Sequence, residues 1–509
     1  MCTVAGVYWF ADQRPPLARL EEQVGDALAT LRNRGPDESS VAAVGAHCVM
    51  GGNRLIIRGA PGRGAMPFVS RRCTAYYNGE IYNYARWNAG ATSDGEVLVP
   101  LYEACGLEAF GQLDGEFAIA LWDDDQQRLL LARDQFGTKP LYFSLNQDRL
   151  LWASSASAIN AMEAHPFCAA VKSSVYTSTY AVQEPYTSFA GIWNLPPGHL
   201  LSVSPQGVSL SAYHLWEDAT QDCTDPTAVF AALETSLTSR MDFQGTIGIP
   251  LSGGVDSGIM AFMANKLGID FHIFSVVEMF GQPTDETPYI LERIARLSNA
   301  RDVTLLRCNR DEYELALAEM YAPDYYDSEK FDGGSICMHT VFTAMRKAGI
   351  RVALDGTGGD ELFHGYKFRE NFQPVAGWPQ PWRTRPYFYS LFTSLLDYTA
   401  KSDRAGAHFS IECRYPFQSV ALMQAAMTMR ISPVLKWPLR AFLLERVDYG
   451  PPLDADRDKK FGFSLENIDP QRIIRDMQQA WCRRNGLRDL PAQPPRPFPF
   501  QIGQPAALL

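Results

Sequence analysis

Several features that would place this chain in a special class are missing from its sequence. Among 509 residues there is no CxxC pair, and the ten cysteines are scattered, which argues against a structural zinc site and a disulfide framework. No apolar stretch reaches the roughly 20 residues that span a bilayer. No run of Lys or Arg offsets the formal net charge of −11, which excludes nucleic-acid binding through an overall positive field.

The composition that remains is that of an ordinary folded protein. Hydrophobic residues make up 46 % and charged residues 20 % of the chain, and its length suits two or three domains. The first seven residues lack the basic segment that opens a signal peptide. We therefore expect a cytoplasmic protein with reduced cysteines and no membrane partner. The sequence leaves its assembly state open, with a homodimer as one option.

The first part of the chain, residues 2–215, is predicted to be an α+β domain built on sandwiched β-sheets. Short apolar runs broken by Gly, Asn and Pro predict strands at 75–77, 117–122, 129–132 and 200–203. Two helices are expected, around residues 19–32 and 96–105.

The second part, residues 225–490, has a different pattern. A helix over 226–241, a buried strand over 246–251, a helix over 258–266 and a strand over 271–277 predict an α/β domain with a parallel sheet. Residues 491–509 are Pro-rich and are expected to form a loosely ordered tail.

Cys2 is the candidate nucleophile because of its position. If the initiator Met is removed, residue 2 carries both a thiol and a free α-amine. The reference pKa of an α-amine is about 8, so this amine can serve as the base for the thiol without a histidine. Met-Cys by itself also begins proteins in which the cysteine has no role.

Four segments that follow Cys2 strengthen this interpretation. They are Arg32-Asn33-Arg34-Gly35-Pro36-Asp37, Asn53-Arg54-Leu55, Asn78-Gly79-Glu80 and Ser93-Asp94. In this order they resemble the class II, or N-terminal nucleophile (Ntn), glutaminase domain. The resemblance implies that Arg54 binds the α-carboxylate of glutamine, and that Glu80 and Asp94 bind its α-ammonium group. Asn78 and the backbone NH of Gly79 would form the oxyanion hole, although Asn78-Gly79 alone also fits a hairpin turn.

A strand, a Ser/Gly loop and a helix follow one another around residues 249–257. Glycines let backbone NH groups approach phosphate oxygens, and the helix amino terminus favours negative charge. The Walker lysine is missing, and the SGGxDS pattern resembles the pyrophosphate loop of enzymes that cleave ATP between its α and β phosphates. The candidate ATP-binding residues here are Ser252, Gly253, Gly254, Asp256 and Ser257.

Both domains together resemble the asparagine synthetase family, including its relatives that make amides or β-lactams in specialised metabolism. Further matching segments are residues 133–142, 195–198, 355–361, 412–417 and 457–459. The resemblance implies ATP as cosubstrate and Mg²⁺ as cofactor. It assigns ATP contacts to Leu251, Val276, Asp355 and Gly356, Mg²⁺ binding to Asp256 and Asp360, and a catalytic phosphate-neutralising role to Lys459, for which Lys460 is the rival.

The chain departs from this family on the synthetase side. Thr357 stands where the family has a glutamate, and a hydroxyl cannot replace a carboxylate base near neutral pH. Gly333 replaces an arginine of the acceptor side, a loss worth roughly 1.5 to 3 kcal/mol of substrate binding. The family segment Pro-Phe-Leu-Asp ends here in Gln418-Ser419.

These departures lead to the hypothesis of an ATP-dependent, amide-forming ligase that takes ammonia from glutamine and activates a carboxylate, which need not be aspartate, as its acyl-adenylate. Three alternatives stay open: asparagine synthesis from aspartate, ring closure as in a β-lactam synthetase, and an inactive binding subunit. The retained set of Cys2, Arg54, Asn78 and Asp94 argues against ring closure, which needs no ammonia.

Overall fold

The structure is a computed structural model with its side chains. It describes residues 1–11, 13–168, 185–216, 219, 222–320, 333–363, 365, 395–430, 436–447, 492–494 and 496–500, together with single residues between 472 and 484. Among the helices described, none combines the length and the apolar character needed to cross a bilayer.

The first domain is built on two six-stranded antiparallel sheets. The first sheet has the order β11 (Trp193–Asn194), β8 (Tyr142–Leu145), β9 (Arg149–Ala153), β1 (Ala5–Trp9), β3 (Cys48–Arg54) and β2 (Glu38–Ala43). The second has the order β13 (Gly207–Ala212), β12 (His199–Ser204), β7 (Arg128–Arg133), β6 (Gly115–Asp123), β5 (Cys73–Ile81) and β4 (Phe68–Val69).

The two sheets pack face to face because their strands alternate in side-chain direction. Val4 and Tyr8 of the β1 segment join Tyr76 of β5 and Ile119 of β6 in one buried core. The alternate residue Val7 packs under the helices on the outer face of the first sheet. These helices are α1 (Leu17–Thr30) and α4 (Ala156–Met162), whereas α2 (Leu98–Cys105) and α3 (Ala109–Gln112) lie beside the second sheet.

The second domain has a mostly parallel sheet. Its order is β16 (Gln282–Pro283), β15 (Phe271–Met279), β14 (Ile247–Pro250), β18 (Val352–Leu354) and β19 (Glu412–Arg414), and β17 (Ala300–Cys308) also pairs with β15. Only β16 runs antiparallel to its neighbour among these strands. The surrounding helices are α6 (Thr227–Met241), α7 (Val255–Lys266), α8 (Thr287–Ile294), α9 (Arg310–Met320), α10 (Gly333–Lys347), α11 (Gly359–Leu362), α14 (Leu396–His408), α15 (Val420–Thr428) and α16 (Trp437–Arg446).

The structure confirms the fold class predicted from the sequence. Helices α1 and α2 and the strands β5, β6, β7 and β12 cover the segments expected in the first domain. In the second, α6, β14, α7 and β15 follow in the expected order. The hairpin reading of Asn78-Gly79 is wrong, because both residues lie inside β5 and pair with Ala118 and Phe117 of β6. The predicted domain boundary falls between β13 and α6.

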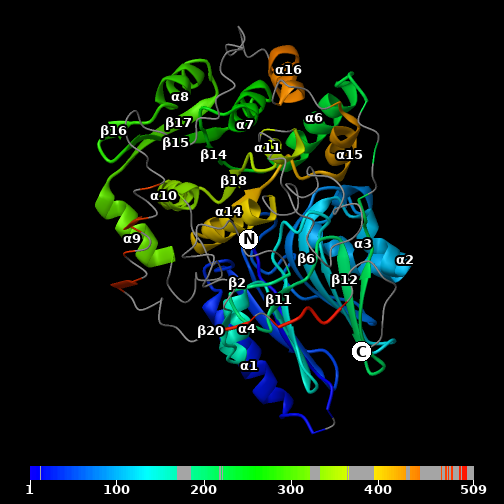
Figure 1. The fold of residues 1–509 in the computed structure, drawn as a ribbon. Coiled ribbons are helices and arrows are strands. Elements are labelled where there is room, and N and C mark those ends of the chain that lie inside the picture. Colours follow the sequence, from blue (N-terminus) through cyan, green and yellow to red (C-terminus); the bar gives the residue numbers. More distant parts are fainter. Residues whose placement is uncertain are drawn as a thin grey trace.

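The domains meet at a buried ionic cluster. Asp403 of α14 pairs with Arg34 at 2.9 Å and with Lys139 at 3.3 Å, and Lys139 also pairs with Glu116 at 3.3 Å. At most 7 % of any of these four residues is exposed. Figure 1 shows the amino terminus where the two domains meet, close to this cluster.

The described parts of the predicted tail, residues 492–494 and 496–500, contact the first domain. β20 (Ala492–Gln493) pairs with β10 (Phe167–Cys168). The indole NH of Trp193 donates to the Arg496 carbonyl at 3.3 Å, and the rings of Phe498 and Phe500 pack on Phe143. Aromatic side chains between the prolines supply the apolar area that docks this segment on the first domain.

The interdomain cluster predicts the effect of Asp403→Asn. The variant leaves Arg34 and Lys139 buried with less compensating charge, so stability should fall by about 3 to 5 kcal/mol. Burial opposes ionisation of Asp403, but Arg34 and Lys139 still lower its pKa. Its contribution is therefore present above the ordinary Asp pKa of about 4 and is lost as the pH falls through the lowered value.

Urea unfolding followed by tryptophan fluorescence measures this loss at the first transition. Glu292→Gln, which removes an exposed pair with Arg296, is the control and should change stability by less than about 1 kcal/mol. Equal stability of Asp403→Asn and the parent chain would contradict a structural role for the cluster.

Candidate active sites

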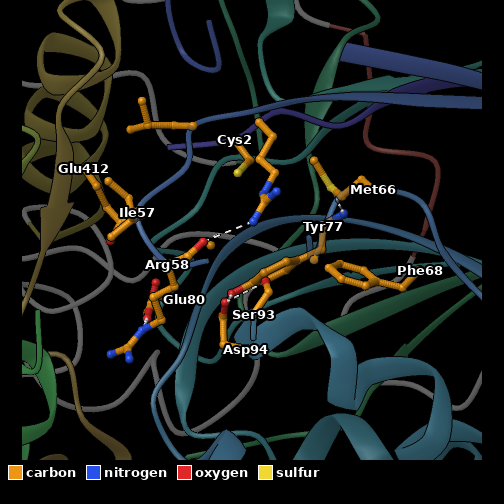
Figure 2. Close-up of a pocket in the computed structure, with 14 residues that line it drawn as sticks. Cys2, Ile57, Arg58, Met66, Phe68, Tyr77, Glu80, Ser93, Asp94 and Glu412 are labelled. Carbon is orange, nitrogen blue, oxygen red and sulfur yellow. Dashed lines mark hydrogen bonds and ion pairs between the residues drawn. The ribbon is translucent and has the colours of Figure 1, made fainter. Parts of the chain in front are cut away.

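A pocket of about 380 Å³ lies beside Cys2 at the edge of the first domain. In Figure 2, Cys2 lies on one side of it and Tyr77, Glu80 and Asp94 lie opposite. The lining residues are Cys2, Arg54, Leu55, Ile57, Arg58, Gly64, Met66, Phe68, Tyr77, Gly79, Glu80, Ser93, Asp94 and Glu412.

Cys2 and Asn78 meet across the two sheets of the first domain. Cys2 directly precedes the β1 segment, and its backbone NH donates to Asn78 Oδ1 of β5 at 3.0 Å. Asn78 is fully buried, and its Nδ2 donor has no hydrogen-bond partner among the described residues. A buried amide donor without a partner is costly, and here it belongs to the side chain that accepts from the Cys2 backbone NH. Such a donor is of the kind that stabilises an oxyanion formed by thiol attack.

Gly79 is required by a close approach of β6. Its φ of +151° lies outside the region that other residues readily adopt, and a Cβ atom would lie 1.9 Å from the Glu116 carbonyl oxygen. Any side chain would push β5 away from β6 and displace Asn78. The glycine therefore holds the neighbouring amide in place, in addition to the oxyanion role implied for its NH.

The polar groups predicted to bind an amino acid come together in the pocket. Asp94 accepts hydrogen bonds from the Ile81 NH at 2.8 Å and from the Tyr77 hydroxyl, so two groups of β5 fix it. Arg54 pairs with Glu38 at 2.8 Å and donates to the Arg58 carbonyl at 3.1 Å. The predicted guanidinium group and the two predicted carboxylates thus line one cavity, as binding of a zwitterion requires.

Two charged residues of the pocket were missed by the sequence interpretation. Arg58 pairs with Glu80 at 2.6 Å, and Glu412 comes from β19 of the second domain. Arg414, also of β19, lies 3.3 Å from Glu80. Arg58 could have been suspected from its place four residues after Arg54, whereas nothing local in the sequence joins Glu412 to this pocket.

Met1 is buried between the domains. Its sulfur lies 3.6 Å from Arg34 Nη2, and burial lowers the pKa of its α-amine to about 6. Burial also raises the pKa of the Cys2 thiol. While Met1 is attached, the nitrogen of Cys2 is an amide and cannot act as a base, so the predicted chemistry depends on removal of Met1.

The second candidate site is the loop between β14 and α7. Arg293 donates to the carbonyls of Ser252 at 2.7 Å and Gly254 at 2.9 Å, and these two hydrogen bonds hold the loop in place. Ser257 Oγ accepts from the Ser252 NH at 3.0 Å. The Gly253 NH donates to the Glu286 carboxylate at 3.1 Å, so a carboxylate already occupies a position suited to an anion.

The predicted nucleotide contacts surround this loop. Leu251 directly follows β14 and Val276 lies within the neighbouring strand β15, and the Leu251 NH donates to the Phe274 carbonyl of β15 at 2.9 Å. Asp355 and Gly356 follow β18, the strand on the other side of β14. A Cβ atom on Gly356 would lie 3.2 Å from the Asp256 backbone, so this glycine lets the two segments meet.

Thr357 does not reach outward as a base would. Its NH and its hydroxyl both donate to Asp355 Oδ1, at 2.9 and 2.7 Å. Asp355 Oδ2 accepts from the Ser402 hydroxyl of α14. Gly333 opens α10, and the residues before it, like Lys459 and its rival Lys460, lie outside the described residues. Gln418 is buried between the domains, where its side chain accepts from Thr138 and donates to Thr399.

Asp256 and Asp360, the predicted Mg²⁺ ligands, are brought together by a shared contact. Both contact the ammonium group of Lys436, Asp256 at 2.5 Å and Asp360 at 2.8 Å. Mg²⁺ prefers oxygen ligands and commonly binds through one or two carboxylates plus substrate phosphates. The two carboxylates therefore fit this ion, although no cluster of three or more potential ligands occurs among the described residues.

Comparison with known proteins adds two domain matches. A family model described as a glutamine amidotransferase domain matches residues 1–214, and one described as asparagine synthase matches residues 228–391. The first match contains every lining residue of the Cys2 pocket except Glu412, and the second contains the loop after β14.

Curated relatives match most of this chain. Asparagine synthetase B of Escherichia coli strain K12 is 26 % identical, with 85 % of this chain and 76 % of that protein covered. A putative asparagine synthetase of Mycobacterium tuberculosis strain H37Rv is 30 % identical, covering 72 % and 61 %. Amidase chry2 of Gibberella zeae is 27 % identical, covering 70 % and 58 %. The chain thus spans about three fifths of the length of the latter two.

The geometry at Asn78 predicts the effect of Asn78→Ala. Loss of the buried amide donor should lower kcat for glutamine hydrolysis by about 100- to 1000-fold, with a smaller change in KM. Glutamate release in the absence of ATP is the measurement. Asn88→Ala, in an exposed loop, serves as the control. A loss of less than about tenfold would rule out an oxyanion role for Asn78.

Glu80 predicts a pH dependence of substrate binding. Burial and the neighbouring Asp94 raise the pKa of Glu80 to about 8, against the opposing effect of Arg414 and Arg58. Because an α-ammonium group needs an ionised partner, KM for glutamine should fall as the pH rises through about 8. The variant Glu80→Gln should show a raised KM without this dependence. A KM of the parent chain that stays constant across this range would contradict the assignment.

Proposed function

Because the chain belongs to the family of glutamine-hydrolysing asparagine synthetases, we propose that it is an ATP-dependent, amide-forming ligase with glutamine as its nitrogen donor. The observation that carries this proposal is the pairing of Cys2 with Asn78, whose amide donor has no partner among the described residues. It supports a nucleophile in the pocket with an oxyanion donor bonded to its backbone.

In the first half-reaction, the Cys2 sulfur attacks the side-chain amide carbon of glutamine. The Cys2 α-amine, freed by loss of Met1, takes the thiol proton and passes it to the leaving nitrogen. Asn78 Nδ2 and the Gly79 NH donate to the developing oxyanion. Ammonia leaves, and water then hydrolyses the thioester to give glutamate.

In the second half-reaction, a carboxylate oxygen of the acceptor attacks the α-phosphorus of ATP and pyrophosphate leaves. Ammonia next attacks the acyl carbon of the adenylate, so that an amide forms and AMP leaves. The loop of Ser252, Gly253 and Gly254 would hold the departing phosphates. Asp256 and Asp360 would hold Mg²⁺, which offsets the negative charge of the phosphates.

The acceptor carboxylate is proposed to differ from aspartate. Thr357 is hydrogen-bonded to Asp355 and offers no base, and Gly333 offers no cation for a second carboxylate. The family includes relatives under other names, such as Amidase chry2 of Gibberella zeae. These points support a larger or less charged substrate of specialised metabolism.

The acceptor proposal predicts the outcome of a direct assay. Purified protein is incubated with ATP, Mg²⁺, glutamine and aspartate, and asparagine and AMP are measured. We expect little asparagine, whereas a screen of other carboxylates should identify one that stimulates pyrophosphate release. Efficient asparagine formation would overturn the altered acceptor and establish aspartate as the substrate.

The variant Cys2→Ala tests the donor half in the same assay with the stimulating carboxylate. AMP release should be lost with glutamine but retained with added ammonium ions. Turnover that ignores this substitution would instead indicate ring closure, with an amine inside the substrate. An inactive binding subunit would release no AMP with any nitrogen source.

A further inference from the structure

In the proposed nucleotide site, charged side chains of the protein contact the proposed metal ligands and the phosphate loop. Lys436 stands directly before α16, and its NH donates to the carbonyl of Phe363 at the end of α11 at 3.1 Å. Its backbone φ of +54° is a left-handed conformation, which costs energy for any residue other than glycine. The surrounding structure thus holds Lys436 in one defined place.

The ammonium group of Lys436 lies between the two carboxylates assigned to Mg²⁺. Only 13 % of the Lys436 side chain is exposed, and the Asp256 and Asp360 side chains are 14 % and 17 % exposed. Asp360 and Lys436 pack tightly against Gly365, since a Cβ atom on Gly365 would lie 1.8 Å from Asp360 Oδ1 and 2.4 Å from Lys436 Cε. An ammonium ion is held where the carboxylates could hold a metal.

A matching anion lies on the phosphate loop. Glu286 Oε2 accepts from the Gly253 NH at 3.1 Å, and a Cβ atom on Gly253 would lie 3.1 Å from the Glu286 Cβ. The carboxylate therefore takes a backbone NH that a phosphate oxygen would need. A positive group and a negative group of the protein occupy the places expected for metal and phosphate.

Resting on the proposed use of ATP, we propose that Lys436 is a phosphate-binding residue of the nucleotide site that exchanges partners when Mg²⁺ and ATP bind. Asp256 and Asp360 would then hold Mg²⁺ in place of the ammonium group, because two cations between the same pair of carboxylates repel one another. The flexible four-carbon stem then lets the ammonium group turn to the phosphates on the adjacent loop. Glu286 gives up the Gly253 NH at the same step.

The exchange predicts opposite effects on metal and nucleotide. Without nucleotide, Lys436→Met should bind Mn²⁺ more tightly than the parent chain, because the two carboxylates lose their competing cation. In the presence of Mg²⁺, the same variant should bind ATP and inorganic pyrophosphate more weakly, by about tenfold or more. Glu286→Gln should bind both phosphates more tightly than the parent chain.

Titration calorimetry for ATP and pyrophosphate, and electron paramagnetic resonance for Mn²⁺, measure these changes on the full chain. Lys347→Met, at the exposed end of α10, is the matched control and should change neither. Lys436→Arg keeps the charge and should retain most of the phosphate affinity. A gain in Mn²⁺ binding cannot result from misfolding, so it separates a local effect from lost structure.

Two results would overturn the exchange. One is ATP binding by Lys436→Met equal to that of the parent chain, which leaves the proposed ligase function intact. The other is unchanged or weaker Mn²⁺ binding by this variant in the absence of nucleotide. A parent chain that binds neither ATP nor pyrophosphate would overturn the proposed function together with the exchange.

Discussion

The contact of Arg414 with Glu80 is the constraint on which the arrangement of the two candidate sites depends. Arg414 lies on β19, the edge strand of the second domain, and reaches a carboxylate of the pocket in the first. Its carbonyl accepts from the Asp355 NH at 2.9 Å, at the start of the nucleotide segment. A single buried residue therefore touches both sites, and a substrate cation that binds Glu80 must share that carboxylate with Arg414 and Arg58.

Several buried ion pairs cross this interface. Buried ion pairs recover their desolvation cost only when their geometry is good and their remaining polar atoms have partners. Here Asp403 and Glu116 each face a cation from the other domain, and Glu412 faces one on its own strand. This sets the relative position of the domains more strictly than apolar packing would, since a small shift leaves a buried charge without compensation.

More of the fold and of the first site could be predicted from the sequence than of the second site. Cys2, Arg54, Glu80 and Asp94 lie in short motifs within one domain, and the pocket brings all four together. Glu412 and Lys436 could not be found in this way. Lys436 lies 180 positions from Asp256, and its partner is set by the packing of α16 near α7, which no local pattern records. Thr357 was noticed as a departure, but only the structure shows it turned to Asp355.

The hydrogen bond from the Cys2 NH to Asn78 joins the segment before β1 of the first sheet to β5 of the second sheet. The nucleophile and its oxyanion donor therefore exist as a pair only after the two sheets have packed. Modification of the thiol by a glutamine-like electrophile would then report completion of that packing during refolding. An N-terminal cysteine that any thiol reagent can label would serve as the marker of chains in which the sheets are still apart.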